Sequence, residues 1–289
     1  MRVGVVGNPR YRDLKSVLEY VSRQAPERGM TLYAEERLAP FWTGELASLG
    51  AVELDALLTF GGDGTLLRGA RLLGGRETPI LGINFGRLGF LTTATRDGLD
   101  EALDCLVAGR YVTERRQVIQ AAIRSGAGEQ RLVQMAVNDV AVHKGGVARV
   151  VRVNVFINGE NVGPYSADGI IVATPTGSTA YSLSAGGPIV VPGVEAMVVT
   201  PIAAHTLAVR PLVVPATYRI VIEPMPGWAE DLLVSFDGQV GTRLAPGESV
   251  DVRRADHRVC LIRLGGDGFF SRMRQKLHWG DLSHREAVR

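Results

Sequence analysis

The sequence predicts an α/β N-terminal domain with a parallel sheet, followed by a β-rich, antiparallel, sandwich-like C-terminal domain. Short apolar segments alternate with amphipathic ones in the first third of the chain, and short β-rich segments dominate after Gly109. The length of 289 residues also allows two hydrophobic cores. The expected division is residues 1–100 for the α/β domain, 101–260 for the β-rich domain, and 261–289 for a C-terminal segment that packs back on the N-terminal domain.

The α/β domain is predicted by buried strands that alternate with amphipathic helices. Each strand candidate is a short apolar run, and each helix candidate has apolar residues three and four positions apart. This alternation is typical of a parallel sheet with helices on its faces. The expected strands are residues 3–6, 56–60 and 79–83, and the expected helices contain Leu14, Val17, Leu18 and Val21 in one case and Leu66, Leu67, Ala70 and Leu73 in the other.

The second domain is predicted by closely spaced strands with turn signals between them. Asn158-Gly159 lies between two strand candidates and is a strong signal for a tight hairpin, and Asp237-Gly238 is a weaker one. Strands at this density with few helical stretches favour an antiparallel sandwich. The expected strands are residues 118–123, 132–142, 150–157, 170–173, 218–222 and 232–236.

Composition narrows the class of protein. The net charge is +2, no run is rich in Lys and Arg, and 6% of the residues are aromatic, which argues against a nucleic-acid partner. Cys105 and Cys260 form no CxxC motif and are expected to be reduced core residues. Met1 leads straight into a strand candidate, and the longest apolar stretch, residues 188–204, is interrupted by prolines and a glutamate. We therefore expect a cytoplasmic protein with neither signal peptide nor membrane partner.

A glycine-rich loop follows the second strand candidate and precedes a predicted helix. Ligands of open α/β sheets bind beyond the carboxyl ends of the strands, where glycines let backbone N–H groups approach phosphate. The single carboxylate of the loop, at Asp63, suits proton abstraction from a hydroxyl or a contact with Mg²⁺. A structural turn that merely caps the helix is the less favoured interpretation. The loop consists of Gly61, Gly62, Asp63, Gly64 and Thr65.

Two further observations qualify the interpretation of the glycine loop as a phosphate site. Arg68 lies one turn into the following helix, and the sequence favours neither a phosphate contact nor a solvent-exposed position for it. A near copy, Gly265-Gly266-Asp267-Gly268, follows a strand-like run but lacks the Thr-Leu-Leu continuation, and we interpret it as a turn. The four letters alone are therefore weak evidence for a phosphate site.

A hydroxyl-rich segment, Thr174-Pro175-Thr176-Gly177-Ser178-Thr179-Ala180-Tyr181-Ser182, follows the strand candidate 170–173. It leads into a short predicted helix that Gly186-Gly187 would end, and Ser166-Ala167-Asp168-Gly169 precedes the strand. Hydroxyls and exposed N–H groups at a helix start suit a ribose or a phosphate. Several hydroxyls in one turn exceed what helix capping requires, so ligand binding is the favoured interpretation.

Asn138 and Asp139 lie inside the apolar run 135–142. Two adjacent polar residues are costly to bury without partners. A bound adenosine would supply such partners, and a bulge or turn would explain the pair equally well. The histidines show no metal-ligand spacing, and neither GxGxxG nor GxxxxGK[ST] occurs, so a nucleotide would bind through another arrangement.

Taken together, these segments resemble NAD kinase. The GGDGT loop is shared with diacylglycerol and sphingoid kinases, and a related form occurs in phosphofructokinase, whereas the hydroxyl-rich segment up to Pro188 is far more specific to NAD kinases. The motifs occur in order over most of the chain. The matching segments are residues 61–67, 82–91, 138–139, 168–169, 174–188, Pro201, 205–207 and 210–211.

The resemblance implies transfer of the γ-phosphate of ATP, or of a phosphate of polyphosphate, to the 2′-hydroxyl of the adenosine ribose of NAD, giving NADP. It implies Asp63 as the general base, Mg²⁺ dependence, and a homodimer or homotetramer. Asp139 stands where the family often has glutamate, and Ser166 where some members have arginine. The full set of candidate ligand-binding residues includes the glycine loop and Arg68. It consists of Gly61, Gly62, Asp63, Gly64, Thr65, Arg68, Asn138, Asp139, Arg149, Asp168, Thr179, Ala180, Tyr181, Ser182, Leu183, Ser184 and Gln239.

Three alternatives differ in what they explain. A lipid kinase would share the GGDGT loop but would not account for the hydroxyl-rich segment. A non-enzymatic NAD(H) sensor would bind the dinucleotide without turnover in the presence of ATP and Mg²⁺. A dehydrogenase is disfavoured because the Rossmann glycine pattern is missing.

Overall fold

The computed structural model describes residues 1–86, 89–126, 128–145, 150–206, 208–225, 232–265 and 268–280. The chain forms two compact units, which we call the α/β unit (residues 1–115 and 259–289) and the β unit (residues 116–258). None of the helices in the described part of the chain combines the length and apolar character that crossing a membrane requires.

The α/β unit is built on a parallel sheet with the strand order β18-β5-β4-β1-β2-β3, and β6 also pairs with β5. Its central strands are buried along almost their whole length, which explains their continuous apolar sequences, because helices cover both faces of such a sheet. The strands are β1 (Arg2–Gly7), β2 (Thr31–Ala34), β3 (Glu45–Leu46), β4 (Ala56–Phe60), β5 (Ile80–Asn84), β6 (Ala94–Thr95) and the end of β18 (Ser249–Arg263).

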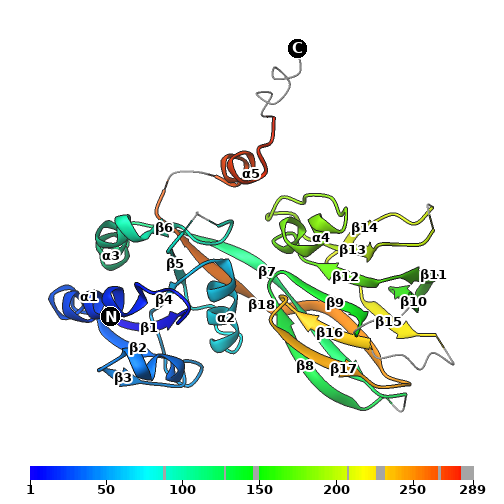
Figure 1. The fold of residues 1–289 in the computed structure, drawn as a ribbon, viewed down its shortest axis with the longest axis horizontal. Helices are drawn as coiled ribbons and strands as arrows, with labels where there is room; N and C mark the ends of the chain where they lie inside the picture. Colours follow the sequence, from blue (N-terminus) through cyan, green and yellow to red (C-terminus); the bar gives the residue numbers. More distant parts are fainter. Residues whose placement is uncertain are drawn as a thin grey trace. The chain divides into compact units, whose positions relative to one another are not determined.

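Helices lie on both faces of this sheet (Figure 1). The apolar stripes of α1 and α3 share one core with Val5, Leu58 and Ile83, whereas Gly69 of α2 packs against Leu57 on the opposite face. The helical segments of the unit are α1 (Leu14–Gln24), η1 (Pro26–Arg28), η2 (Glu36–Phe41), α2 (Asp63–Leu72), η3 (Arg96–Gly98), α3 (Leu99–Val107) and α5 (Phe269–Leu277). The helices predicted around Leu14 and Leu66 are therefore confirmed.

The order of strands in the α/β unit creates a switch point between β1 and β4. The chain proceeds from β1 to β2 on one side and then reaches β4 on the other side of β1. At such a point the connections after neighbouring strands diverge and leave a crevice at the carboxyl edge of the sheet. The glycine loop and the start of α2 follow β4 at this edge, and the N–H of Asn8, just after β1, donates to Phe60 O at 3.0 Å.

The β unit consists of two sheets that enclose one core, as expected for a sandwich. The first contains β11-β10-β15-β18 with β7 and β8, the second has the order β14-β13-β12-β9-β16-β17, and side chains of both meet in a common apolar cluster. The elements are β7 (Val112–Arg124), β8 (Gln130–Ala136), β9 (Asp139–Lys144), β10 (Val151–Ile157), β11 (Glu160–Ala167), β12 (Gly169–Ala173), η4 (Gly177–Thr179), α4 (Tyr181–Ser184), β13 (Ala196–Ile202), β14 (Leu212–Pro215), β15 (Ile220–Pro224), β16 (Leu232–Phe236) and β17 (Val240–Leu244).

Both predicted tight turns are confirmed. Asn158 and Gly159 have φ values of 50° and 89° and connect β10 to β11. Asp237 and Gly238, with φ values of 51° and 62°, follow β16 in the same way. Two successive residues in the left-handed region are what a two-residue hairpin turn requires, and Asn, Asp and Gly tolerate this conformation best.

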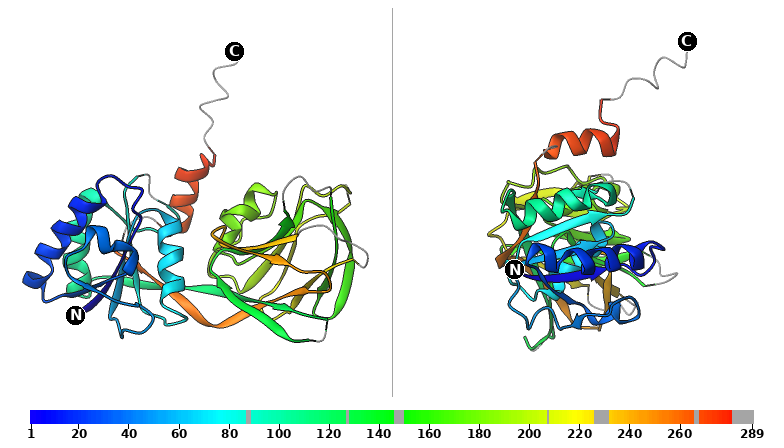
Figure 2. Two further views of the ribbon diagram at one scale, coloured as in Figure 1. Left: turned by 60° about the horizontal axis from the view of Figure 1, so that its bottom comes forward. Right: turned by 90° about the vertical axis from the view of Figure 1, so that its left-hand side faces the viewer.

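Two sequence-based boundaries differ from the structure. The division after residue 100 would place most of α3 in the β-rich domain, but Leu103 and Leu106 belong to the core of the α/β unit, which extends to Arg115. The chain enters the β unit along β7 and returns along β18, so the α/β unit is discontinuous in sequence (Figure 2). The run 132–142, expected as one strand, is interrupted between β8 and β9 at Val137 and Asn138.

Candidate functional site

The glycine loop begins where β4 ends. Gly61 has a φ of +150°, and a Cβ there would lie 2.3 Å from Thr65 Oγ1, so the position requires glycine. At Gly62, by contrast, φ is −87°, and among the described residues the closest atom to an added Cβ is the hydroxyl of Tyr11 at 3.8 Å. No described residue therefore crowds the backbone of Gly62 at the N-terminus of α2, where the first N–H groups of a helix attract anions.

Asp63 is the first residue of α2, and its carboxylate accepts hydrogen bonds from three successive backbone N–H groups. Phe90 N donates to Oδ2 at 2.8 Å, and Leu91 N and Thr92 N donate to Oδ1 at 3.1 and 3.2 Å. A carboxylate oxygen has two lone pairs. Among the described residues Oδ2 accepts only the bond from Phe90, so this atom keeps the capacity to accept a hydroxyl proton.

The segment that binds Asp63 approaches it through a glycine. A Cβ on Gly89 would lie 1.9 Å from Asp63 Oδ1, so any side chain there would displace the carboxylate. Thr92 is fully buried and accepts hydrogen bonds from Gly89 N at 3.0 Å and Asn84 Nδ2 at 3.2 Å. The segment 89–93, which we call the Asp63 loop, is thus tied to the carboxyl end of β5.

Arg68 lies on α2 and contacts the protein interior. Its guanidinium forms an ion pair with Glu35 and donates to Gly7 O at 2.7 Å, and Glu35 also accepts from Gly7 N at 3.0 Å. These bonds connect α2 to the carboxyl end of β1. A phosphate contact of Arg68 stays a prediction.

In the β unit, Asp237 holds the break between β8 and β9. Its carboxylate accepts from Val137 N, Asn138 N and Asp139 N at 3.3, 2.7 and 3.4 Å. Asp237 N donates in return to Asp139 O at 2.9 Å. The break that the polar pair 138–139 indicated is therefore a turn stabilised by an aspartate from the hairpin after β16.

Asp139 is a buried carboxyl at the start of β9. It is 3% exposed, and no hydrogen bond of the described residues reaches its side chain. Burial, and after it the negative charge of Asp237, raise the pKa of Asp139 from an ordinary 3.8 to about 7. A largely buried carboxyl without a protein partner is unfavourable unless water or a ligand supplies one, so Asp139 is a candidate for a ligand contact.

The hydroxyl-rich segment is joined to Asn138 by its backbone. Thr174 N donates to Asn138 O at 2.8 Å, and Thr174 Oγ1 donates to Val137 O at 2.6 Å. A Cβ on Gly177 would lie 2.0 Å from Asn138 O, so this position requires glycine. Two motifs that are separated by more than thirty residues in the sequence therefore form one substructure.

Most hydroxyls of this segment bond within the protein. Ser178 Oγ donates to Pro175 O at 2.7 Å and accepts from Val190 N at 2.9 Å, and Ser182 Oγ lies 2.8 Å from Thr200 Oγ1. The high number of hydroxyls in this segment is therefore explained in part by these internal hydrogen bonds and by the helical turn, and not by ligand binding alone. Tyr181 and Ser184 are exposed, and Thr179, Ala180 and Leu183 are partly exposed.

The other candidate residues have different surroundings. Asp168 forms an ion pair with Lys144 Nζ at 2.9 Å, and both side chains are about one-third exposed, at 32% and 33%. Gln239 is exposed in the turn that contains Asp237. Arg149 lies outside the described residues, as do Gly266 and Asp267 of the second glycine turn.

Lys144 and the structural role of Asp237 are not among the features predicted from the sequence. Lys144 ends the strand that Asp139 begins, so its position on β9 was a usable signal. Asp237 was interpreted only as a turn former, because a short-range pattern does not show that its carboxylate reaches residues a hundred positions away.

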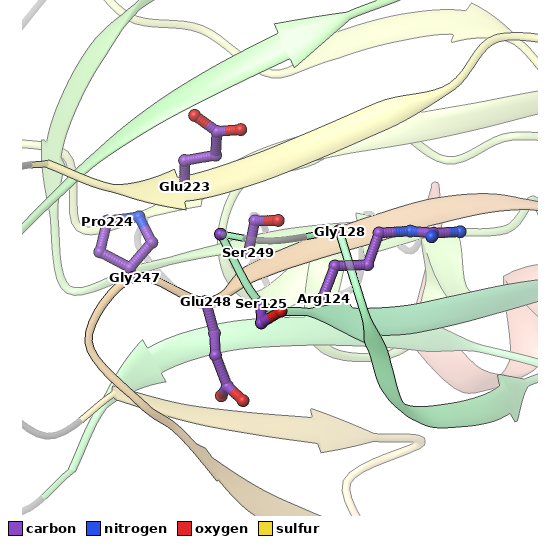
Figure 3. A pocket seen from close by; sticks show the side chains of 9 residues that line it. Arg124, Ser125, Gly128, Glu223, Pro224, Gly247, Glu248 and Ser249 are labelled. Atoms are coloured by element: carbon purple, nitrogen blue, oxygen red, sulfur yellow. The ribbon is translucent and has the colours of Figure 1, made fainter.

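The described residues contain no group of three His, Cys, Asp or Glu side chains that would hold a metal ion. A cavity of about 380 Å³ lies in the β unit, and none of the candidate residues lines it. Figure 3 shows the side chains of Arg124, Glu223 and Glu248 leaving the backbone in different directions instead of converging. Arg124 forms an ion pair with Asp251, and Glu248 forms one with Arg131. The charges of these two cavity residues are therefore already balanced by partners within the protein.

The α/β unit places a glycine loop with one carboxylate at the switch point of a parallel sheet, and the chain has a second unit, a β-sandwich. Together these features define a two-domain kinase. Residues 3–111 match the ATP-NAD kinase N-terminal domain, and residues 137–264 match the ATP-NAD kinase C-terminal domain. The chain belongs to the NAD kinase family and is an enzyme with kinase activity.

Individual relatives agree with this assignment. The chain is 50% identical over 292 residues to NAD kinase of Gemmatimonas aurantiaca, with 99% of each chain covered, and 39% identical over 282 residues to NAD kinase of Desulforamulus reducens, with 95% and 96% covered. It is similar to the structure of an NAD kinase from Archaeoglobus fulgidus in complex with ATP, with 26% identity, a TM-score of 0.75 and coverages of 96% and 99%. Yeast NADH kinase complexed with NADH shares the fold, with 24% identity, a TM-score of 0.89 and coverages of 97% and 88%.

Proposed function

We propose that this enzyme transfers the γ-phosphate of ATP, or a phosphate of inorganic polyphosphate, to the 2′-hydroxyl of the adenosine ribose of NAD. The products are NADP and ADP, or a polyphosphate shortened by one unit. The observation that carries the proposal is the carboxylate of Asp63 in the glycine loop. Backbone N–H groups of the Asp63 loop hold this carboxylate in place, and Oδ2 keeps the capacity to accept another hydrogen bond. The chain's membership of the NAD kinase family identifies the substrate class.

Asp63 acts as the general base in this proposal. Oδ2 accepts the proton of the 2′-hydroxyl while the hydroxyl oxygen forms a bond to the γ-phosphorus, and the bond between this phosphorus and the bridging oxygen breaks. Phosphoryl transfer depends mainly on positioning and charge stabilisation, so a carboxylate fixed by three backbone N–H groups is suited to this role.

The phosphates of the donor would lie at the glycine loop. The space beside Gly62 and the helix N-terminus at Asp63 support this placement. We propose that Mg²⁺ arrives with ATP, as a substrate complex held mainly by phosphate oxygens. The ATP complex of the similar enzyme from Archaeoglobus fulgidus supports ATP as the donor.

The β unit would bind NAD. Asp139 is buried without a hydrogen-bond partner among the described residues, which supports a contact with a polar group of the dinucleotide. Asn138, Asp168, the segment 179–184 and Gln239 are proposed as further contacts, together with Arg149. The complex of yeast NADH kinase with NADH supports a dinucleotide ligand for this fold.

We also propose a homodimer or homotetramer in the cytoplasm. The edge strand β14 exposes Leu212 and Val213 at 36% and 53%, and exposed apolar groups on an edge strand favour pairing with another chain.

The test is incubation of the purified protein with NAD, ATP and Mg²⁺, followed by an NADP-specific assay. NADP should accumulate, and replacement of ATP by polyphosphate identifies the donor. Binding of NAD without NADP formation would instead indicate a sensor. Phosphorylation of a lipid but not of NAD would indicate a lipid kinase.

A further inference from the structure

The Asp63 loop is bonded on two opposite sides. Its N–H groups donate to the Asp63 carboxylate, as described above. Its carbonyl groups accept hydrogen bonds from two arginines of the C-terminal part of the chain, Arg263 at the end of β18 and Arg272 on α5. All these residues belong to the α/β unit.

The arginine contacts are specific and buried. Arg263 donates from Nη1 to Leu91 O at 2.9 Å and from Nη2 to Phe90 O at 3.3 Å. Arg272 donates from Nη1 to Phe90 O at 3.1 Å and to Thr92 O at 3.3 Å. The two arginines are 7% and 5% exposed. Because a buried guanidinium is costly unless hydrogen-bonded, these contacts strongly constrain the loop.

Two peptide groups of the loop connect the carboxylate to the guanidinium groups. In the peptide between Phe90 and Leu91, the N–H points at Asp63 and the carbonyl at both arginines. In the peptide between Leu91 and Thr92, the N–H also points at Asp63 and the carbonyl at Arg263. Each peptide dipole, of about 3.5 D, is therefore aligned between a negative and a positive charge.

This alignment has a consequence for Asp63. A peptide group that rotated away would lose hydrogen bonds to a charged partner at both ends, and such bonds are roughly twice as strong as neutral ones. The arginines therefore hold the N–H groups in the orientation that fixes the carboxylate. We propose that Arg263 and Arg272 are positioning residues for phosphoryl transfer, which act on Asp63 through the two peptide groups of the Asp63 loop. This inference rests on the proposed role of Asp63 as the base.

A purely structural role for Arg272 makes a different prediction. Phe269 and Phe90 have ring centroids 6.4 Å apart, so α5 also contacts the Asp63 loop through aromatic packing. If Arg272 only attached α5, its loss would lower stability and would leave the turnover of the folded enzyme unchanged. A positioning role predicts a lower kcat at nearly constant KM for NAD and ATP, because ground-state binding does not need the base in place.

The first experiment compares Arg272→Gln and Arg272→Lys with Arg274→Gln. Arg274 lies on the same helix and is exposed, so its replacement is a matched loss of charge. For Arg272→Gln we expect kcat to fall roughly 10- to 100-fold, the range for a small misplacement of a reacting group, with KM values changed by less than about threefold. Arg272→Lys keeps the charge and should recover part of the activity, and Arg274→Gln should match the wild type. Unchanged kcat in a folded Arg272→Gln enzyme would overturn the inference.

The second experiment is a double-mutant cycle with Asp63→Asn. If Arg272 acts through the Asp63 base, Arg272→Gln should lower kcat by less than about twofold in the Asp63→Asn background. An equal loss in both backgrounds would show that Arg272 acts independently of Asp63. If Arg272→Gln does not fold, Arg263→Lys is tested in the same cycle. In the wild type Arg263 Nε lies 2.9 Å from a carboxylate oxygen of Glu114, and lysine keeps the positive charge opposite this group. Absence of NADP formation by the wild type would contradict the proposed function itself, whereas fully active Arg263 and Arg272 variants would contradict only this inference.

Discussion

Asp237 and Asp139 are joined by two hydrogen bonds, although their carboxyl groups would repel each other if both were ionised. Asp237 N donates to Asp139 O at 2.9 Å, while the Asp237 carboxylate bonds to Asp139 N at 3.4 Å. The same carboxylate adds to the effect of burial in raising the pKa of Asp139 to about 7. The arrangement fixes the start of β9 and at the same time keeps a proton on Asp139 up to neutral pH.

Asp139→Asn should remove a pH dependence of stability. In the folded protein Asp139 retains its proton up to a pKa of about 7, whereas in the unfolded chain it ionises near 3.8. Between these pH values the unfolded state binds fewer protons than the folded state. The Asp139 carboxyl therefore contributes stability that is fully present below pH 3.8 and is lost as the pH rises to about 7. The free energy of unfolding of the variant should therefore rise relative to the wild type across this window, by at most about 1.4 kcal/mol per pH unit.

Urea unfolding of both proteins at pH 5, 6, 7 and 8 measures this difference. A constant difference between Asp139→Asn and the wild type over the whole series would show that Asp139 ionises at the same pH in both states.

Asp237→Ala should weaken both the fold of the β unit and NAD binding. The change leaves the N–H groups of Val137, Asn138 and Asp139 without this acceptor, and alanine is strained at the φ of 51°. We expect a loss of about 2–3 kcal/mol in the free energy of unfolding and a roughly tenfold higher KM for NAD.

Asp237→Asn keeps an acceptor oxygen and a residue that tolerates positive φ, so its effects should be smaller. Asp256→Ala, at an exposed position on β18, serves as the matched control. The assigned role fails if Asp237→Ala and Asp256→Ala have the same stability and the same KM for NAD.

Asp63→Asn should fold and bind NAD but lose most of its turnover. Asparagine keeps one acceptor oxygen for the Asp63 loop but cannot take up a proton, so kcat should fall at least about 100-fold. Calorimetry with NAD and a steady-state NADP assay measure the two properties separately. Near-wild-type NADP production by this variant would exclude Asp63 as the base.

Gly62→Ala should affect the phosphate donor without affecting the fold. The nearest heavy atom of the described residues to the added Cβ is Tyr11 Oη at 3.8 Å, so we expect the methyl group to cost less than about 1 kcal/mol at this helix N-cap position. A phosphate close to this backbone would be displaced by the methyl group, which should raise the KM for ATP several-fold. The comparison is Gly98→Ala, at the N-cap of α3, where the nearest atom in the described part of the chain is Thr95 Oγ1 at 3.9 Å.

An unchanged KM for ATP in Gly62→Ala would place the phosphates elsewhere. Raised KM values in both variants would point to a general effect of alanine at a helix N-cap.

Local features of the sequence predicted the fold well. The apolar run at residues 56–60 gave a buried strand, and the glycine loop after it lies at the carboxyl edge of the sheet as expected. Asn158-Gly159 forms the tight hairpin that its composition predicts. In each case the determining interactions are between residues close in sequence, which is why pattern and composition were sufficient.

Interactions between distant residues were not predictable in this way. The bonds from Arg263 and Arg272 to the Asp63 loop span 170 or more positions, and nothing near either arginine in the sequence indicates them. The hydroxyl-rich segment shows the related difficulty that composition does not reveal how a hydroxyl is used. Ser178 and Ser182 bond inside the protein, and only the folded structure distinguishes them from the exposed Ser184.

The path of β18 sets the order in which the two units are completed during synthesis. The residues of the β unit, 116–258, are all made before Val259 leaves the ribosome, and the last segment of the α/β unit follows them. Until then the parallel sheet lacks its β18 strand next to β5, and the Asp63 loop lacks both arginines. A nascent chain therefore contains the whole β unit, which we propose binds NAD, before the two arginines can hold the carboxylate of the proposed base, Asp63.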